Sequence, residues 1–235
     1  MKYIIALVLG LIIGAAILVV GVAYNPFIVD RALSPLSVTK AEVIALNYSA
    51  VPTENIVYTN NGESLQSPYP DKVLQLWEAP IRKTSAMATM MRNARNQPTG
   101  IGIKISSQSE STDLLRGMVI VDSIWYVYTP QHGSMFIQQS ENYLPFIREV
   151  AFPAWRSSAN NWRGTWLDNM TAGPGALETA AVSGGSGRVK GLELDGVESL
   201  SVRAFSTDTG FVAAEGLLLI ELPGPVDDTE EDLVP

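Results

Sequence analysis

The sequence contains no cysteine and only one histidine, His132. The absence of cysteine excludes disulfides, thiolate nucleophiles and zinc–thiolate centres. No H-E-x-x-H motif, nucleophile elbow or Ser-His-Asp arrangement is recognisable either. We therefore expect neither a metal site nor a bound cofactor, and we expect a hydrophobic core to hold the folded part of the chain together.

A surplus of basic residues is also missing. The chain has 16 Lys and Arg residues against 24 Asp and Glu residues, a formal net charge of −8. Five of the acidic residues gather near the C-terminus, at Asp227, Asp228, Glu230, Glu231 and Asp232. The rest of the chain is close to neutral, so nucleic acid and anionic lipid surfaces are poor partners for the folded part.

What the sequence does contain is an uninterrupted apolar run, Ile4 to Ala23, without charge, proline or polar side chain. Twenty helical residues cover roughly the 30 Å hydrocarbon core of a bilayer. The run therefore predicts a transmembrane helix, with the membrane as a partner through residues 4–23. A cleaved secretory signal is the alternative, but its apolar region is typically only about 7 to 15 residues long.

The predicted orientation follows from Lys2, which stays cytoplasmic under the positive-inside rule and leaves the bulk of the chain outside. An exported domain without disulfides fits a bacterial envelope. The expected localisation is thus the cell inner membrane, single-pass, with a periplasmic domain. Gly10, Gly14 and Gly21 share one face of the predicted helix and could pack against a partner helix.

The rest of the chain divides by composition. We predict a transmembrane signal-anchor at residues 1–24, a juxtamembrane linker at 25–39, a β-rich domain at 40–223 and an acidic disordered tail at 224–235. A Gly/Pro loop marks a subdomain boundary near 171–176. The expected fold class is α+β: one transmembrane helix followed by a mainly antiparallel extracytoplasmic domain with one or two helices.

Two segments favour helices in this domain. In Ile81 to Arg95, Met87, Met90, Met91 and Ala94 recur at helical spacing, and we expect these methionines to pack in a core rather than to bind Cu(I). A shorter helix is expected from Tyr143 to Phe152.

The remaining pattern indicates strands. Ile101, Ile103 and Ile105 alternate and predict a half-buried strand, and residues 116–138 predict a central hairpin. After residue 176 we expect a four-stranded antiparallel meander, at 177–183, 188–194, 198–205 and 211–222.

The most unusual composition lies between residues 155 and 166. Trp155, Arg156, Trp162, Arg163 and Trp166 are candidate binding residues for a protein partner or a glycan, because Trp and Arg dominate binding hot spots. The alternative is that the Trp rings close a β core. Alternation in an extended segment places Trp162 and Trp166 inward and Arg163 outward.

Residues 160–166 have the N-x-x-x-G-x-W spacing, which is similar to the first strand of lipocalins. Only 69 residues follow Trp166, too few for a closed eight-stranded barrel after that strand, so the sequence does not predict that family.

The sequence therefore favours a non-enzymatic, membrane-anchored envelope protein whose outer domain binds or scaffolds another component. The alternative is a membrane-anchored hydrolase or carbohydrate-active domain with dispersed carboxylates. A deep pocket holding two facing carboxylates with raised pKa values would favour the enzyme, and a shallow aromatic surface would favour binding.

Overall fold

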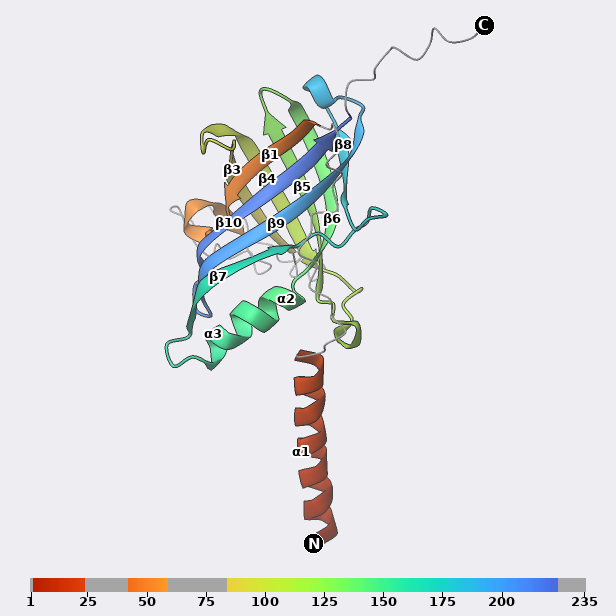
Figure 1. Cartoon of the computed structure of the whole chain (residues 1–235), viewed down its shortest axis with the longest axis vertical. Coiled ribbons are helices and arrows are strands. Elements are labelled where there is room, and N and C mark those ends of the chain that lie inside the picture. Colours follow the sequence, from red (N-terminus) through yellow and green to blue (C-terminus); the bar gives the residue numbers. More distant parts are fainter. Residues whose placement is uncertain (1, 24–41, 59–83, 224–235) are drawn as a thin grey trace, which may run out of the picture.

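The computed structural model describes residues 2–23, 42–58 and 84–223. In this part the chain forms a closed antiparallel β-barrel of eight strands (Figure 1). The fold class is therefore mostly β, and the α+β prediction with a transmembrane helix is wrong. The predicted linker at 25–39 and acidic tail at 224–235 lie outside the described residues.

The ring of the barrel runs β1-β10-β9-β8-β6-β5-β4-β3 and closes where Asn47 of β1 pairs with Arg92 of β3. Its strands are β1 Glu42–Ser49, β3 Thr84–Arg92, β4 Pro98–Gln108, β5 Ile120–Thr129, β6 Gly133–Asn142, β8 Ala180–Gly184, β9 Glu193–Ser206 and β10 Gly210–Leu222. Two more strands attach to this ring. β2 (Ile56–Tyr58) pairs with β3, and β7 (Asn161–Asn169) pairs with the second half of β9.

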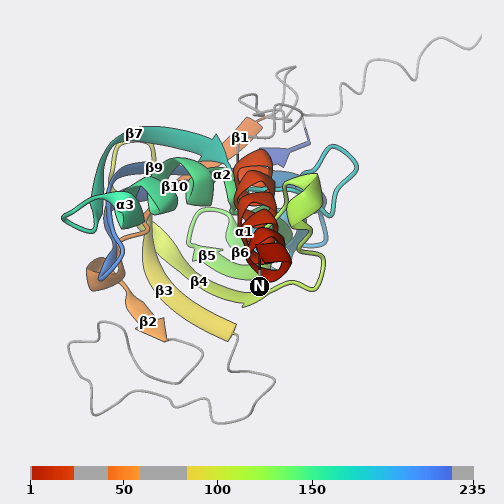
Figure 2. The same cartoon turned by 90° about the horizontal axis from the view of Figure 1, so that it is seen from below.

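A short helical segment lies at one end of the barrel. It consists of α2 (Leu144–Phe146), one π-helical stretch (Ile147–Ala151) and α3 (Phe152–Arg156), which confirms the predicted helix in this region. Figure 2, which looks at the barrel from below, shows this segment beside β7, across the barrel from β3 and β4. The helical segment therefore lies on the β7 side of the barrel and not on the side of β3 and β4.

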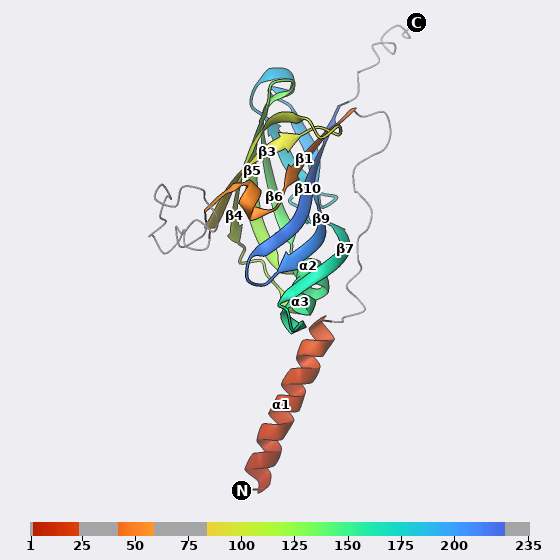
Figure 3. The ribbon, with the colours of Figure 1, turned by 90° about the vertical axis from the view of Figure 1, so that its left-hand side faces the viewer.

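The N-terminal helix α1 spans Lys2–Ala23 and projects beyond the end of the barrel (Figure 3). A helix needs about 20 consecutive apolar residues to cross a bilayer. The side chains of α1 are described without interruption only over residues 9–18, and no helix in the described part of the chain is long and apolar enough to span a membrane. By this criterion the prediction of a transmembrane anchor at residues 4–23, and of a single-pass inner-membrane protein with it, is wrong.

Two of the three glycines predicted to share a face of this helix have no neighbour among the described residues. A Cβ atom added at Gly10 or Gly14 would meet no atom within 4 Å. The surroundings of Gly21 lie outside the described side chains.

The methionine-rich segment is a strand, β3, and not the predicted helix. Met87 and Met91 are four residues apart, a spacing that suits one face of a helix and equally one face of a strand. In the barrel Met91 is fully buried, whereas Met90 points outward and is 49% exposed. The prediction of a helix here was wrong because β3 pairs with β4 along its whole length, and this pairing overrides the local helix preference of methionine.

The central hairpin is confirmed as β5 and β6, which pair along their whole length. The C-terminal meander has three strands rather than four. The stretches predicted at 188–194 and 198–205 are largely one long strand, β9, which continues through the expected turn at Asp195-Gly196. Gly196 lies inside this strand, where an added Cβ would lie 3.0 Å from Val182 Cγ2.

Two hydrophobic clusters pack in the described part of the chain. The first contains residues such as Leu46, Met135, Val182 and Ile220. The second lies beneath the helical segment and contains Phe146, Val150, Trp166, Met170, Leu200, Val202 and Ala214. Charged side chains lie in the interior beside the first cluster, because Tyr48 and Trp125 of that cluster donate hydrogen bonds to Glu198.

Candidate functional site

The candidate binding residues of the Trp/Arg stretch do not form one surface. Trp166 is buried and Trp162 is partly buried, both in the second hydrophobic cluster. Arg163 is exposed, as the alternation along β7 predicts. Trp166 also donates a hydrogen bond from Nε1 to Glu149 Oε2, at 3.1 Å, which ties β7 to the helical segment.

The other two residues of this stretch lie on α3 and face outward. Trp155 is 67% exposed and its ring lies 5.8 Å from that of Phe152. The guanidinium of Arg156 lies over the ring of Phe152, 5.8 Å from the ring centroid. Trp155 and Arg156 thus form a small exposed aromatic and cationic site, separate from the two inward Trp residues.

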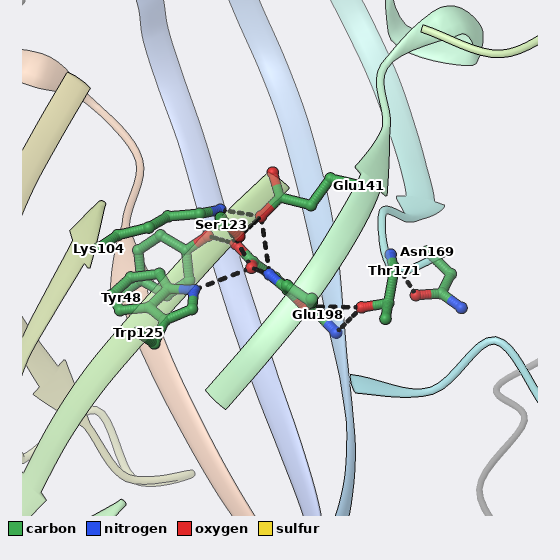
Figure 4. Close-up of polar contacts among 9 residues, drawn as sticks. Tyr48, Lys104, Ser123, Trp125, Glu141, Asn169, Thr171 and Glu198 are labelled. Atoms are coloured by element: carbon green, nitrogen blue, oxygen red, sulfur yellow. Dashed lines mark hydrogen bonds and ion pairs between the residues drawn. The ribbon is translucent and has the colours of Figure 1, made fainter. Parts of the chain in front are cut away.

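Three charged residues that the sequence patterns did not predict to be neighbours meet inside the barrel (Figure 4). Lys104 of β4, Glu141 of β6 and Glu198 of β9 form a group that we call the charge cluster. Lys104 is 7% exposed, Glu198 is 2% exposed and Glu141 has no exposed area. Such a group is costly to desolvate unless each charge is paired and hydrogen-bonded.

Glu198 is the most heavily bonded member of the charge cluster. Lys104 Nζ lies 2.8 Å from its Oε1 and 3.1 Å from its Oε2. Trp125 donates from Nε1 to Oε2 at 3.0 Å, and Tyr48 and Gln139 also donate to this carboxylate. The chain makes room for the two rings with glycines, because a Cβ at Gly102 would overlap Trp125 and one at Gly216 would overlap Tyr48.

Among the described residues, the close contacts of Glu141 gather on its Oε1. Its Oε1 lies 2.5 Å from Lys104 Nζ and accepts hydrogen bonds from Ser123 Oγ at 2.6 Å and Gln139 Nε2 at 2.7 Å. Its Oε2 is buried and has no hydrogen-bond partner among the described atoms. Two carboxylates therefore share one lysine, and the fully ionised charge cluster carries one excess negative charge.

The environments of the two carboxylates move their pKa values in opposite directions. Burial raises the pKa of Glu141, and the nearby charge of Glu198 adds to this effect. Burial acts on Glu198 too, but the charge of Lys104 and the donated hydrogen bonds outweigh it and lower the pKa of Glu198. The two negative charges likewise overcome the effect of burial on Lys104 and raise its pKa well above the ordinary value.

These shifts predict how stability depends on pH. The carboxyl group of a free Glu titrates at about pH 4.3. Because the pKa of Glu141 is raised, the folded protein keeps a proton on Glu141 at pH values where the unfolded chain has already released it. That stabilisation is complete below about pH 4 and is lost as the pH rises through the raised pKa of Glu141. The contribution of Glu198 has the opposite sign and is lost as the pH falls below about 4, through its lowered pKa.

We expect Glu141→Gln to flatten the decrease in the free energy of unfolding that Glu141 causes in the parent as the pH rises above about 4.3, a slope of at most about 1.4 kcal/mol per pH unit. The acid loss due to Glu198 should persist in this variant. Urea unfolding of both proteins at several pH values measures the difference. Equal slopes in the two proteins above pH 5 would show that Glu141 does not titrate as described.

A second feature lies on the outside of the barrel. Eight large apolar side chains, each between 38% and 60% exposed, project outward from four consecutive strands. We call this surface the outer face, and it consists of Met90, Ile101, Ile103, Ile105, Ile124, Tyr126, Tyr128 and Phe136.

The strand register makes the outer face continuous. Ile101, Ile103 and Ile105 of β4 stand opposite Tyr128, Tyr126 and Ile124 of β5. Met90 stands opposite Ile101 on one side, and the ring of Phe136 lies 5.1 Å from that of Tyr126 on the other. Directly opposite side chains on one face of a sheet touch, so these residues form one patch and not scattered exposed positions.

Two surface hollows accompany these features. One, of about 270 Å³, adjoins the outer face and is lined in part by Ile105, Ile124, Asp122 and Ser140. The other, of about 550 Å³, lies over β1, β9 and β10 and is mostly polar, with Arg92, Arg203 and Glu215 among its lining residues. Neither hollow is lined by a carboxylate of the charge cluster.

The outer face inverts the orientation that the sequence predicts for β4. Its isoleucines were expected to point inward, but the inward positions are held by Gly102 and Lys104. The charge cluster was missed for the same reason. The sequence signal for an apolar outer surface was in β5, where apolar residues occur on both sides of the strand. Trp125 and Val127 point inward, and Tyr126 points outward.

Among the described residues, no group of three His, Asp or Glu side chains is placed to hold a metal ion. The fold defines the chain as an eight-stranded antiparallel β-barrel with a buried charge cluster and an apolar outer face. No protein-family model matches the sequence, and no curated protein matches it.

Proposed function

We propose that this protein is a non-enzymatic binding or scaffolding protein whose contact surface is the outer face of β3, β4, β5 and β6. One observation carries the proposal: eight large apolar side chains lie side by side on the outside of the barrel. Exposed apolar patches of this kind are typical of sites that contact another macromolecule. The mixture of isoleucine, tyrosine, phenylalanine and methionine suits a protein partner better than a glycan, which needs polar groups beside the rings.

The buried chemistry supports a structural role for the carboxylates. Glu141 and Glu198 face the same lysine, and both are almost completely removed from solvent. Five donor contacts from Tyr48, Lys104, Trp125 and Gln139 occupy the oxygens of Glu198. A substrate would have to displace these groups, so the arrangement favours stabilising the barrel over catalysis.

A hydrolase is the second candidate function, and one specific observation favours it. The pKa of Glu141 is raised while that of Glu198 is lowered, and such a divided pair can supply a general acid and a base. Under this alternative, the outer face would play no part, and Glu141→Gln would abolish turnover while leaving every macromolecular contact intact.

Photo-crosslinking tests the proposed contact surface. A photoreactive amino acid is placed at position 126, in the centre of the outer face, and in a matched control at Leu167, an apolar side chain that is 70% exposed on β7. In cells of the native host, we expect a defined covalent adduct from position 126 and none from position 167. Absence of an adduct at position 126, or the same adducts from both positions, would contradict the proposal.

A further inference from the structure

We propose that the partner of the outer face is a second copy of this chain, joined face to face by a two-fold axis. This inference rests on the proposed function, since it names the partner of the same surface. The area of the face, the placement of charge at its ends and the two-sided apolar character of β5 each support it.

The area of the outer face matches what a stable dimer needs. Its eight side chains expose about half of their surface, roughly 100 Å² each, which amounts to about 800 Å² on one copy. A standard specific interface buries about 800 Å² on each partner. The face therefore supplies one half of an ordinary interface without any contribution from the rest of the barrel.

The charges at the ends of the outer face are self-complementary. Arg92 lies at the border of one end, opposite Pro98 of β4, and Asp122 lies at the other end, opposite Ser107. The guanidinium of Arg92 donates to Asn96 O, and Arg92 also lines the hollow over β1, β9 and β10. These positions are nine residues apart along β4, or roughly 30 Å. A two-fold axis through the middle of the face brings Arg92 of each copy to the Asp122 end of the other, as an isologous contact requires.

The net charge of the chain also favours this surface over others for self-contact. Two copies, each with a formal charge of −8, repel each other unless they meet through a region without excess negative charge. All eight members of the outer face are uncharged. These eight side chains therefore add no contact between like charges at the interface.

The pattern of β5 indicates that its outer side is covered. Residues 124–128 read Ile-Trp-Tyr-Val-Tyr, apolar on both sides of the strand. Strands that pack on both faces have such continuous apolar runs, whereas a strand with one solvated face alternates apolar and polar residues. The barrel interior covers Trp125 and Val127, and the second copy covers Tyr126 and its neighbours.

Sedimentation equilibrium of the full chain tests the dimer. We expect a species of twice the 25.4 kDa chain mass at micromolar concentration. Ile103→Thr with Tyr126→Thr, both outward changes to a residue that strands favour, should raise the dimer dissociation constant at least about 100-fold. The matched control, Leu167→Thr with Val212→Thr, alters exposed apolar residues outside the outer face and should leave it unchanged.

A charge exchange tests the two-fold arrangement itself. Arg92→Asp alone should weaken the dimer several-fold, and Arg92→Asp combined with Asp122→Arg should restore it, because the complementary ends are then merely reversed. A loss of folding cannot produce such a rescue. Circular dichroism of each variant verifies the fold.

Three results would overturn the dimer: a monomeric parent chain at about 100 μM, association that survives both outer-face substitutions, or no rescue in the exchanged pair. Association through α1, for example, would survive all of these substitutions. In the crosslinking experiment, an adduct of position 126 with a different protein would overturn the dimer yet support the proposed function. No adduct at all would contradict the proposed function.

Discussion

Replacing Lys104 with methionine is expected to lower the free energy of unfolding by about 3–5 kcal/mol, the effect seen when one partner of a buried ion pair is removed. Lys104 is the positive charge that both Glu141 and Glu198 face inside the barrel. Without it, two buried carboxylates lie close together and must either remain unpaired or take up protons. Because small proteins are stable by only about 5–15 kcal/mol, this single change should be visible in any urea titration.

Two further variants establish the cause of that loss. Lys190→Met removes an exposed lysine and should change the free energy of unfolding by less than about 0.5 kcal/mol. Adding Glu141→Gln and Glu198→Gln to Lys104→Met removes all three charges and should recover most of the stability. If the triple variant is as unstable as the single one, the loss comes from packing of the lysine stem and not from unpaired charge.

Trp166→Ala should produce a second large effect, a loss of about 3–5 kcal/mol. The Trp166 ring fills the cluster beneath the helical segment and lies 5.6 Å from the ring of Phe146. Its removal leaves a cavity and also breaks the hydrogen bond to Glu149. Thermal unfolding followed by circular dichroism measures the shift.

The matched control for this variant is another tryptophan of the same stretch. Trp155 is exposed on α3, so Trp155→Ala should leave stability within about 0.5 kcal/mol of the parent. Similar melting temperatures for the two Trp variants would mean that Trp166 does not fill a core.

Local pattern was sufficient to predict much of the β structure. Alternation and turn residues located β5 and β6 as a hairpin and the strands that follow residue 176, because each pairs with a neighbour in sequence. The barrel itself was not predictable in the same way. Its closure depends on pairing between β1 and β3, and between β6 and β8, which are separated by long intervening segments.

The lipocalin-like spacing in β7 shows a related limit. A barrel was rejected because only 69 residues follow Trp166, yet most strands of this barrel precede that residue. Sixty-nine residues are too few only if the motif marks the first strand of the barrel. In this chain it marks an additional strand attached to β9.

The orientation of β4 could not be derived from alternation alone. Isoleucines are expected to be inward, and a shift of one residue exchanges the two faces of a strand completely. Lys104 is inward because Glu141 and Glu198 reach it from β6 and β9, which lie far away in sequence. Nothing in the local sequence of β4 identifies these partners.

The most direct test of the account is hydroxyl-radical footprinting of the outer face, in cells of the native host and in a dilute solution of the purified full chain. If the outer face is a contact surface, Met90 and Tyr126 should oxidise several-fold more slowly in the cell than in dilute solution. Exposed Trp155, which lies on α3 and is not part of the outer face, should oxidise equally in both. Equal oxidation of Met90 and Tyr126 under the two conditions would mean that nothing covers the outer face and would contradict the account.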